Sequence, residues 1–292
     1  MIAPMTSGAR EAGAERPIRA AAPGHDRESL RRAYLELLKL ALCDLVGVGT
    51  TSVQGKPGGG LEPRELTGDR RRERARGQDW PLHGLTMTGL ARLDDLQGCV
   101  ESILEGGVEG DLIEAGSWRG GSSMLMRATL DTLAANERTV YVADSFAGFP
   151  TAEQSPPGEY PETLGPYLSA FEVLTAPLEE VAESFERLGL GRGVEFVPGF
   201  FEQTLPPLSG HRWSLIRLDA DTYDATMLAL RSLYPGLSPG GYAIIDDYGA
   251  LEECRVAVQR FRSEQGIEEP LVQVDEACVR WRRAQARPPT GT

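Results

Sequence analysis

Four aspartates follow two apolar runs of the sequence, and their spacing favours metal-assisted acid–base chemistry. Asp219 and Asp221 end the first run in RLDADTY, and Asp246 and Asp247 end the second in IIDDY. If the two runs are neighbouring parallel strands, the four carboxylates meet at one edge of the sheet. Close like charges disfavour joint ionisation, and a hard cation such as Mg²⁺ removes that penalty by binding carboxylate oxygens. The alternative is that some of these aspartates cap helices or close turns.

A divalent ion at this edge would activate a hydroxyl group. An alcohol is a poor nucleophile at neutral pH, and a metal lowers the pKa of a hydroxyl that coordinates it. The vicinal diol of a sugar could chelate such an ion, and a nearby carboxylate would take the proton as a general base. The aspartates therefore predict a magnesium site for deprotonating a small, sugar-like acceptor.

A Gly-rich turn between a predicted strand and a predicted helix indicates a cofactor site. The turn EAGSWRGGSS runs from Glu114 to Ser123, at the carboxyl end of its strand, where ligands bind in doubly wound sheets. Its ExGxxxGG spacing differs from the GxGxxG of a dinucleotide site. Asp144 ends the next strand, where a carboxylate can accept both ribose hydroxyls. NAD remains the alternative cofactor on these two features, and a helix N-cap or turn is the structural alternative for Asp144.

The sequence does not favour histidine-based catalysis or a serine hydrolase. The histidines His25, His83 and His211 all lie outside the predicted strand-end motifs, which disfavours a histidine-based mechanism. The GxSxG turn of a serine hydrolase does not occur in the sequence. Ser122 and Ser123 are better interpreted as residues of the first turn of a helix.

A parallel sheet must position these motifs. Beyond Gly110, short apolar runs alternate with helical patterns, which is typical of a parallel sheet covered by helices. The predicted strands are Asp111–Ala115, Thr139–Asp144, Val194–Pro198, Trp213–Asp219 and Gly241–Asp247, followed by an antiparallel hairpin of Leu271–Val274 and Cys278–Arg282. The predicted helices among them are Ser122–Asn136, Leu178–Leu188, Asp224–Tyr234 and Glu252–Gln265.

The N-terminal third precedes this sheet. Amphipathic patterns predict helices over Glu28–Leu45 and Thr88–Glu105. Between them, the Gly/Pro-rich residues 55–60 and the arginine run 70–76 are predicted to be loop, with the arginines in a solvated, mobile segment. The expected organisation is a disordered tail over residues 1–27, a helical and lid region over 28–109, a cofactor-binding domain over 110–284 and a disordered tail over 285–292.

Composition excludes several partners. The 292-residue chain carries a formal net charge of −13, which argues against a nucleic-acid surface. Its apolar runs are too short for a transmembrane helix, and its first residues lack a signal-peptide pattern. The cysteines are far apart without a CxxC pair, so we expect reduced thiols in a cytoplasmic protein. They are Cys43, Cys99, Cys254 and Cys278.

The motifs resemble those of the macrocin O-methyltransferase family, sugar O-methyltransferases from macrolide and aminocoumarin antibiotic pathways. The similar stretches cover roughly residues 30 to 283 in the family's order and spacing. They are TMTGLARLDDLQGCVESIL (Thr86–Leu104), GDLIEAGSWRGGSS (Gly110–Ser123), VADSFAGFP (Val142–Pro150), LEEVAESF (Leu178–Phe185), VEFVPGFFEQTLP (Val194–Pro206), RLDADTYDATMLALRSLYPGLSPGGYAIIDDYGALEECRVAV (Arg217–Val258) and VDEACVRWRR (Val274–Arg283).

The resemblance implies an α/β fold of class I S-adenosylmethionine-dependent methyltransferases: a Rossmann-like, mostly parallel seven-stranded sheet with a C-terminal antiparallel hairpin and an N-terminal helical extension. It also implies dependence on S-adenosyl-L-methionine and Mg²⁺, a glycosylated natural product as acceptor, and a homodimer or larger homo-oligomer with the N-terminal segments near the interface. Matching positions imply Asp221 as the catalytic base and Asp219, Asp246 and Asp247 as metal ligands. The implied cofactor-binding residues are Thr86, Met87, Glu114, Gly116, Trp118, Asp144, Ser145 and Phe146.

The sequence departs from the family pattern in places. Ala115 and Ser117 stand where the family often has Thr or Val, and Leu85-Thr86-Met87 stands where His-Thr-Met is common. The segment 55–76 matches only loosely. A methyltransferase acting on a catechol or on nitrogen is an alternative on the same scaffold, and a non-catalytic cofactor-binding partner is a further one. Asp221 disfavours the last, because a protein that only binds needs no base beside a metal site.

Overall fold

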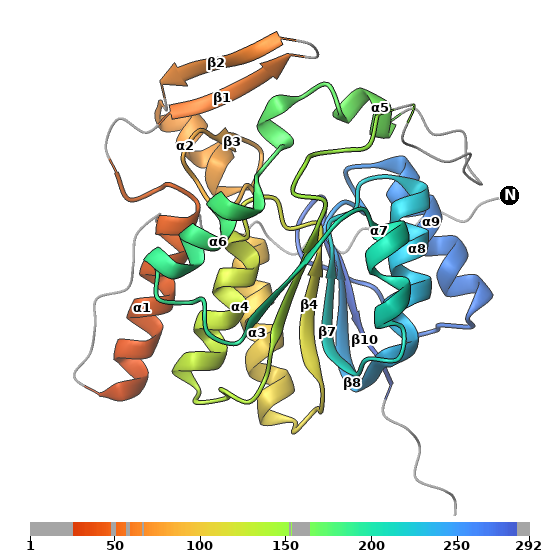
Figure 1. Cartoon of the computed structure of the whole chain (residues 1–292). Coiled ribbons are helices and arrows are strands. Elements are labelled where there is room, and N and C mark those ends of the chain that lie inside the picture. The colour runs from red at the N-terminus through yellow and green to blue at the C-terminus, as the bar shows by residue number, and fades with distance from the viewer. Residues whose placement is uncertain are drawn as a thin grey trace, which may run out of the picture.

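The computed structural model describes residues 26–47, 51–56, 59–65, 67–151, 153 and 164–284, so most of both predicted tails lies outside it. A seven-stranded sheet lies at the centre, with helices on both faces (Figure 1). Its strand order is β6-β5-β4-β7-β8-β10-β9, parallel from β6 to β8, with β10 antiparallel to both neighbours. The predicted mostly parallel sheet and its antiparallel hairpin are therefore confirmed. The strands are β4 (Asp111–Ala115), β5 (Val140–Asp144), β6 (Val194–Pro198), β7 (Trp213–Leu218), β8 (Leu237–Ile245), β9 (Val272–Gln273) and β10 (Val279–Arg282).

Helices bury both faces of this sheet. Parallel strands covered on both sides need apolar residues at successive positions, and the central strands have them. On β7, Leu215 packs into the core on one face, while Ile216 and Leu218 pack into the core on the other. The first face is covered by α1 (Arg27–Leu42), α3 (Leu90–Glu105), α4 (Gly121–Thr132) and α6 (Leu178–Arg187), and the second by α7 (Phe201–Thr204), α8 (Tyr223–Leu233) and α9 (Glu252–Glu264). Among the described helices, none has the length and apolar character needed to cross a bilayer.

The predictions of loop over residues 55–60 and over the arginine run 70–76 are wrong for the described parts of those segments. Strands β1 (Thr51–Lys56) and β2 (Gly59–Glu65) form an antiparallel pair, and β3 (Trp80–Pro81) joins β1 on its other side. This small sheet projects above the main one (Figure 1). The arginine run forms α2 (Gly68–Ala75). These elements escaped prediction because their sequences lack an apolar period and their pairing partners stabilise them instead.

Arg74 contradicts the expected mobility of the arginine run. Its side chain is only 1% exposed. Its guanidinium donates to Asp79 at 2.8 Å, to Asp44 at 3.1 Å and to the carbonyl of Thr51 at 3.0 Å. Arg74 thus ties α2 to the residues after α1 and to β1. Breaking such a buried pair costs about 3–5 kcal/mol because a carboxylate loses its partner.

Two cover segments lie above the carboxyl ends of the strands. The first consists of β1, β2 and β3 with the residues that follow β3 up to Gly84, and the second contains α5 (Leu164–Leu168) and the short 3₁₀ helix η1 (Glu172–Leu174). Phe171 and Val173 of the second segment pack with Val53 of β1 in a small hydrophobic cluster. The cover is therefore built from two parts of the chain that are far apart in sequence. Two more 3₁₀ helices, η2 (Pro206–Leu208) and η3 (Tyr234–Gly236), flank β7 and β8.

The four cysteines are free thiols, and all of them are buried. This confirms the expected absence of disulfides. Burial raises the pKa of the Cys43 thiol to about 12. A thiol that stays protonated is a weak nucleophile, so Cys43 serves as a core residue.

Candidate active site

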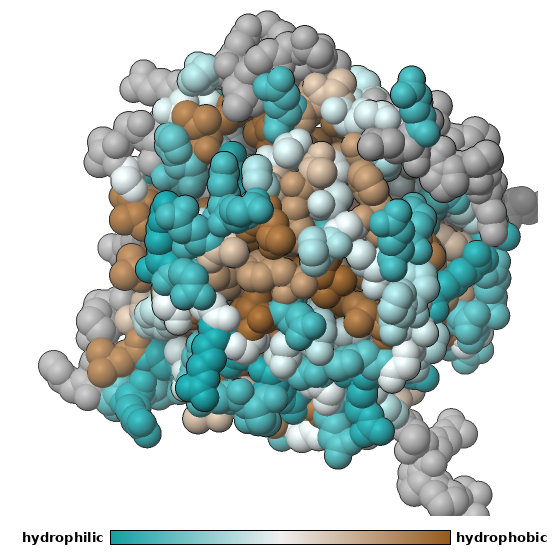
Figure 2. Space-filling view, in the orientation of Figure 1, coloured by the Kyte–Doolittle hydropathy of each residue, from teal (hydrophilic) through white to brown (hydrophobic). Residues whose placement is uncertain are grey.

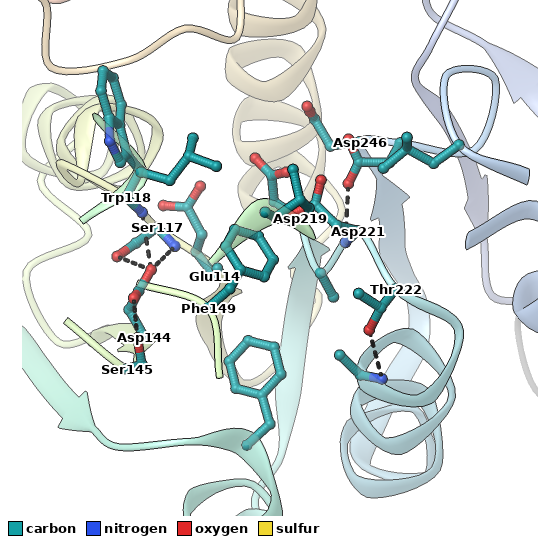
Figure 3. Close-up of a pocket in the computed structure, with 18 of the residues that line it drawn as sticks. Glu114, Ser117, Trp118, Asp144, Ser145, Phe149, Asp219, Asp221, Thr222 and Asp246 are labelled. Carbon is teal, nitrogen blue, oxygen red and sulfur yellow. Dashed lines mark hydrogen bonds between the residues drawn. The ribbon is translucent and has the colours of Figure 1, made fainter. Parts of the chain in front are cut away.

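A cavity of about 650 Å³ opens at the carboxyl ends of β4, β5, β7 and β8 (Figure 3). The Gly-rich turn and the aspartates of the sequence analysis line this same cavity. Its walls also include residues from the N-terminal third and from both cover segments. Lining residues that matter for its chemistry are Trp80, Thr86, Met87, Thr88, Arg92, Glu114, Gly116, Ser117, Trp118, Asp144, Ser145, Phe149, Arg217, Asp219, Asp221, Asp246 and Asp247.

Gly116 brings the Gly-rich turn against the end of β7. Its φ of +87° lies in the left-handed region, which a residue with a side chain rarely adopts. A Cβ at this position would stand 1.8 Å from the carbonyl oxygen of Asp219. Only glycine therefore lets the turn after β4 and the acidic end of β7 share one cavity.

Asp144 organises the Gly-rich turn. One carboxylate oxygen accepts the backbone N–H groups of Ser117 at 2.8 Å and Trp118 at 3.0 Å (Figure 3), and the other accepts the N–H of Phe146 at 2.9 Å. This is the turn role named above as the structural alternative. Each carboxylate oxygen has two lone pairs, so the oxygen that accepts a single backbone N–H, that of Phe146, can still accept a hydrogen bond from the cavity side.

The predicted cofactor residues on either side of Asp144 differ in their surroundings. Ser145 lines the cavity, and its hydroxyl donates to the carbonyl of Gly148 at 2.6 Å. The ring of Phe146 instead packs in the core, edge-on to Phe196 with 6.1 Å between centroids. Phe146 therefore reaches the site through its backbone, and its ring is a core element.

Trp118 and Arg119 fasten the Gly-rich turn to both cover segments. The indole N–H of Trp118 donates to the carbonyl of Val173 at 2.7 Å. The guanidinium of Arg119 lies 4.1 Å from the centre of the Trp118 ring and donates to the carbonyls of Leu82 and Gly84, each at 2.9 Å. The same two side chains therefore hold the Gly-rich turn against the cover of the cavity.

Thr86 and Met87, two of the predicted cofactor-binding residues, line the cavity. Their segment lies directly on the start of α4, because the N–H of Gly121 donates to the carbonyl of Leu85 at 2.9 Å. A Cβ on Gly121 would stand 2.6 Å from that carbonyl oxygen. The N-terminal third thus forms a wall of the site.

Glu114 lies on the floor of the cavity inside a buried ion-pair network. It stands directly opposite Arg217 in the register of β4 and β7, so both side chains point to the face covered by α3 and α4. Arg217 donates to Glu114 at 2.6 Å, to Asp219 at 3.1 Å and to Thr88 at 3.2 Å. Ser123 donates a short hydrogen bond to Glu114. Burial raises the pKa of Glu114 to about 7 against the opposing pull of Arg217.

Three of the four aspartates form a cluster of carboxylates. Asp219, Asp221 and Asp247 each place a carboxylate oxygen within 4.8 Å of the others. Burial raises the pKa of all three, and repulsion among them and from Asp246 adds to the effect. Asp221 has a left-handed φ of 55°, and its N–H lies 3.4 Å from the Asp247 carboxylate. Three hard oxygen donors that repel one another fit a divalent cation.

Asp246 lies apart from that cluster. One of its oxygens accepts from Arg217 and the other from Arg92, each at 2.5 Å. Strand alternation explains the separation, because Asp246 follows Ile244 on the α3 side of the sheet, and Asp247 turns the other way. The predicted metal ligands were Asp219, Asp246 and Asp247. The structure instead gathers Asp219 and Asp247 with Asp221.

Sequence reasoning missed two arginines that line the cavity, Arg217 and Arg92. Arg217 had a detectable signal, since a charged residue in an otherwise apolar strand needs a buried partner. Arg92 had none, because its partners Asp246 and Asp275 are more than 150 residues away in the chain.

Comparisons with known proteins agree with this geometry. Residues 60–283 match the macrocin-O-methyltransferase (TylF) family model. The sequence is 43% identical over 267 residues to the 8-demethyl-8-(2,3-dimethoxy-alpha-L-rhamnosyl)-tetracenomycin-C 4'-O-methyltransferase of Streptomyces olivaceus, covering 89% of this chain and 95% of that protein. It is 40% identical over 253 residues to the mycinamicin III 3''-O-methyltransferase of Micromonospora griseorubida, covering 86% and 96%.

The fold has a solved counterpart. The structure of the O-methyltransferase NovP is similar with a TM-score of 0.76 and 35% sequence identity, covering 87% of this chain and 100% of that one. The residues that match the family model include every strand of the seven-stranded sheet and all the lining residues named above.

Proposed function

Since this chain belongs to the macrocin-O-methyltransferase family and is an O-methyltransferase, we propose that it methylates a sugar hydroxyl of a glycosylated secondary metabolite, with S-adenosylmethionine as donor and a divalent metal as activator. The observation that carries the proposal is the contact of Gly116 with Asp219. It brings a cofactor-type turn and a carboxylate cluster into one cavity.

The residues around the Gly-rich turn fit the cofactor. Gly116 exposes backbone at the turn, and Asp144 offers acceptor capacity for ribose hydroxyls beside it. Ser145 and Trp118 line the adjoining wall, and Thr86 and Met87 line the wall formed by the N-terminal third. S-adenosylmethionine supplies an electrophilic methyl group. The chain's own residues hold it and, with the fastened cover, exclude water.

The aspartates fit a magnesium ion. Asp219 and Asp247 belong both to the ligand set implied by the family and to the carboxylate cluster, and Asp246 would complete the set. The ion supplies a lowered pKa to a hydroxyl that binds it. Asp221 belongs to the cluster and lines the cavity, so it would take the hydroxyl proton.

The relatives and the lining of the cavity together support a glycosylated acceptor. The relative from Streptomyces olivaceus is named as a 4'-O-methyltransferase of a 2,3-dimethoxy-rhamnosyl tetracenomycin. Such a group offers its 4'-hydroxyl and the neighbouring methoxy oxygen to a carboxylate-bound ion. Phe149, Phe200 and Leu251 add apolar surface to the same cavity, suited to the remainder of a glycosylated metabolite.

Calorimetric titration tests the cofactor. We expect S-adenosylmethionine to bind and NAD not to, and we expect Asp144→Ala to weaken binding by about 1–3 kcal/mol, the scale of hydrogen bonds to a charged group. Asp111→Ala is the comparison, since Asp111 lies at the start of β4, away from the cavity lining. Binding of NAD alone would refute the proposal. Binding without methylation of any glycoside tested would favour the non-catalytic alternative.

We also propose that a second copy of the chain covers an exposed face of α1. Leu35, Leu38 and Leu42 pack inward, but Leu30, Tyr34 and Leu37 are 53%, 42% and 50% exposed. These three recur at helical spacing on one face. Figure 2 shows hydrophobic side chains at the edge of the molecule formed by this helix.

Light scattering at micromolar concentration should give at least a dimer for the unmodified chain and a monomer for Leu37→Asp, because a charge in an apolar interface is left without a partner. Val272→Asp is the matched control, since Val272 is 40% exposed on β9. A monomeric unmodified chain, or equal dissociation of both variants, would remove this face as the interface.

A further inference from the structure

Arg92 crosses from α3 to the floor of the cavity without a role in the proposed reaction. Its guanidinium donates to Asp246 at 2.5 Å and to Asp275, in the β9–β10 connection, at 2.7 Å. Burial opposes its charge, but these two carboxylates more than offset that effect and raise the pKa of Arg92 above its ordinary value. A permanent cation therefore stands at the edge of the carboxylate cluster.

The two guanidiniums that hold Asp246 differ in their freedom. Arg217 is 2% exposed and also bonds Glu114, Asp219 and Thr88, so it is fixed from several sides. Arg92 is 12% exposed, lines the cavity and has Asp275 as its second partner. If Asp246 exchanges one of its two arginine partners for another group, the hydrogen bond to Arg92 is the one that can break.

The charges around Asp246 provide a reason for it to exchange its arginine partner. Asp246 lines the same cavity as Asp219, Asp221 and Asp247 and is adjacent to Asp247 in sequence, while its two oxygens face the arginines. A divalent cation among these carboxylates would attract Asp246 and repel Arg92.

We propose that Arg92 is an internal counter-ion for Asp246: its guanidinium keeps Asp246 outside the carboxylate cluster, and a divalent cation displaces it to gain Asp246 as a ligand. The inference rests on the proposed function, which supplies the ion. It makes Arg92 a positioning residue that acts through Asp246. It also reconciles the ligand set implied by the family with the cluster of Asp219, Asp221 and Asp247.

Manganese binding provides a test that does not depend on turnover. Free Mn²⁺ is measured by electron paramagnetic resonance during titration of the whole chain. We expect Arg92→Met to bind Mn²⁺ on the order of tenfold more tightly, because a competing cation beside the site is gone. Arg92→Lys keeps the charge and should bind nearly as the unmodified chain does.

Arg280→Met is the matched control. Arg280 lies on β10 and pairs at 2.8 Å with Asp95, a residue of α3, the helix that also carries Arg92. It lies outside the cavity lining. Its replacement by methionine changes the net charge as much as Arg92→Met does and should leave Mn²⁺ affinity unchanged. In the background of Asp246→Asn, Arg92→Met should no longer tighten binding, since the two residues act as a pair.

Each outcome bears on the inference. Equal or weaker Mn²⁺ binding by Arg92→Met than by Arg280→Met, with circular dichroism showing intact folds, would overturn it and leave the metal proposal standing. Persistence of the Arg92→Met effect in Asp246→Asn would also overturn it. If neither the unmodified chain nor any variant binds Mn²⁺, the metal proposal and this inference fail together.

Discussion

Replacing Asp221 by asparagine is expected to lower kcat by about 10²–10⁴-fold, the usual contribution of a positioned general base. Asparagine keeps the shape of the side chain and removes its basicity. Asp221 lines the cavity beside Asp219 and Asp247, where the acceptor hydroxyl is proposed to bind. Turnover is measured from pH 6 to 9 at saturating cofactor and magnesium.

The comparison with Asp219→Asn separates two roles within the cluster. Asp219→Asn should raise the magnesium concentration needed for half-maximal turnover, whereas Asp221→Asn should leave that concentration and cofactor affinity nearly unchanged. Because Asp221 lies in the ion-free cluster, it could instead be a ligand. Equal loss of Mn²⁺ affinity in both variants would assign Asp221 to the metal, and near-normal turnover of Asp221→Asn would remove it from the mechanism.

Chelation should abolish turnover completely, and added Mg²⁺ should restore it. Without an ion, the acceptor hydroxyl keeps its high pKa, and the carboxylates of Asp219, Asp221 and Asp247 repel one another across the place where the hydroxyl must bind. Loss of activity in EDTA and its recovery with excess Mg²⁺ are measured by methylation of a glycosylated acceptor.

Cofactor binding is the control for this experiment. The residues proposed to hold the cofactor lie mainly on the turns after β4 and β5, so calorimetric binding should persist in EDTA. Full turnover in excess chelator would contradict the metal proposal. The clustered aspartates would then be structural groups at strand ends.

Local sequence patterns were sufficient to predict the strands of the sheet and the edge at which the cavity opens. Apolar runs separated by helical periods predicted the strands from β4 to β10, since a strand buried on both faces must be apolar along its length. Glycines and acids at strand ends predicted where the cavity opens, because parallel strands share a carboxyl edge. Gly116 and Asp144 both lie there.

Only the tertiary structure shows which strands pair and which charged side chains form ion pairs. The strands β1 and β2 and the buried Arg74 lacked a sequence signal, because partners elsewhere in the chain stabilise them. The same holds for Asp246: its neighbour Asp247 joins the cluster, while Asp246 turns toward Arg92, a residue more than 150 positions earlier in the sequence. The spacing of apolar residues can be read from a segment by itself. The partner of a charged side chain depends on which distant segments the fold brings within a few ångströms.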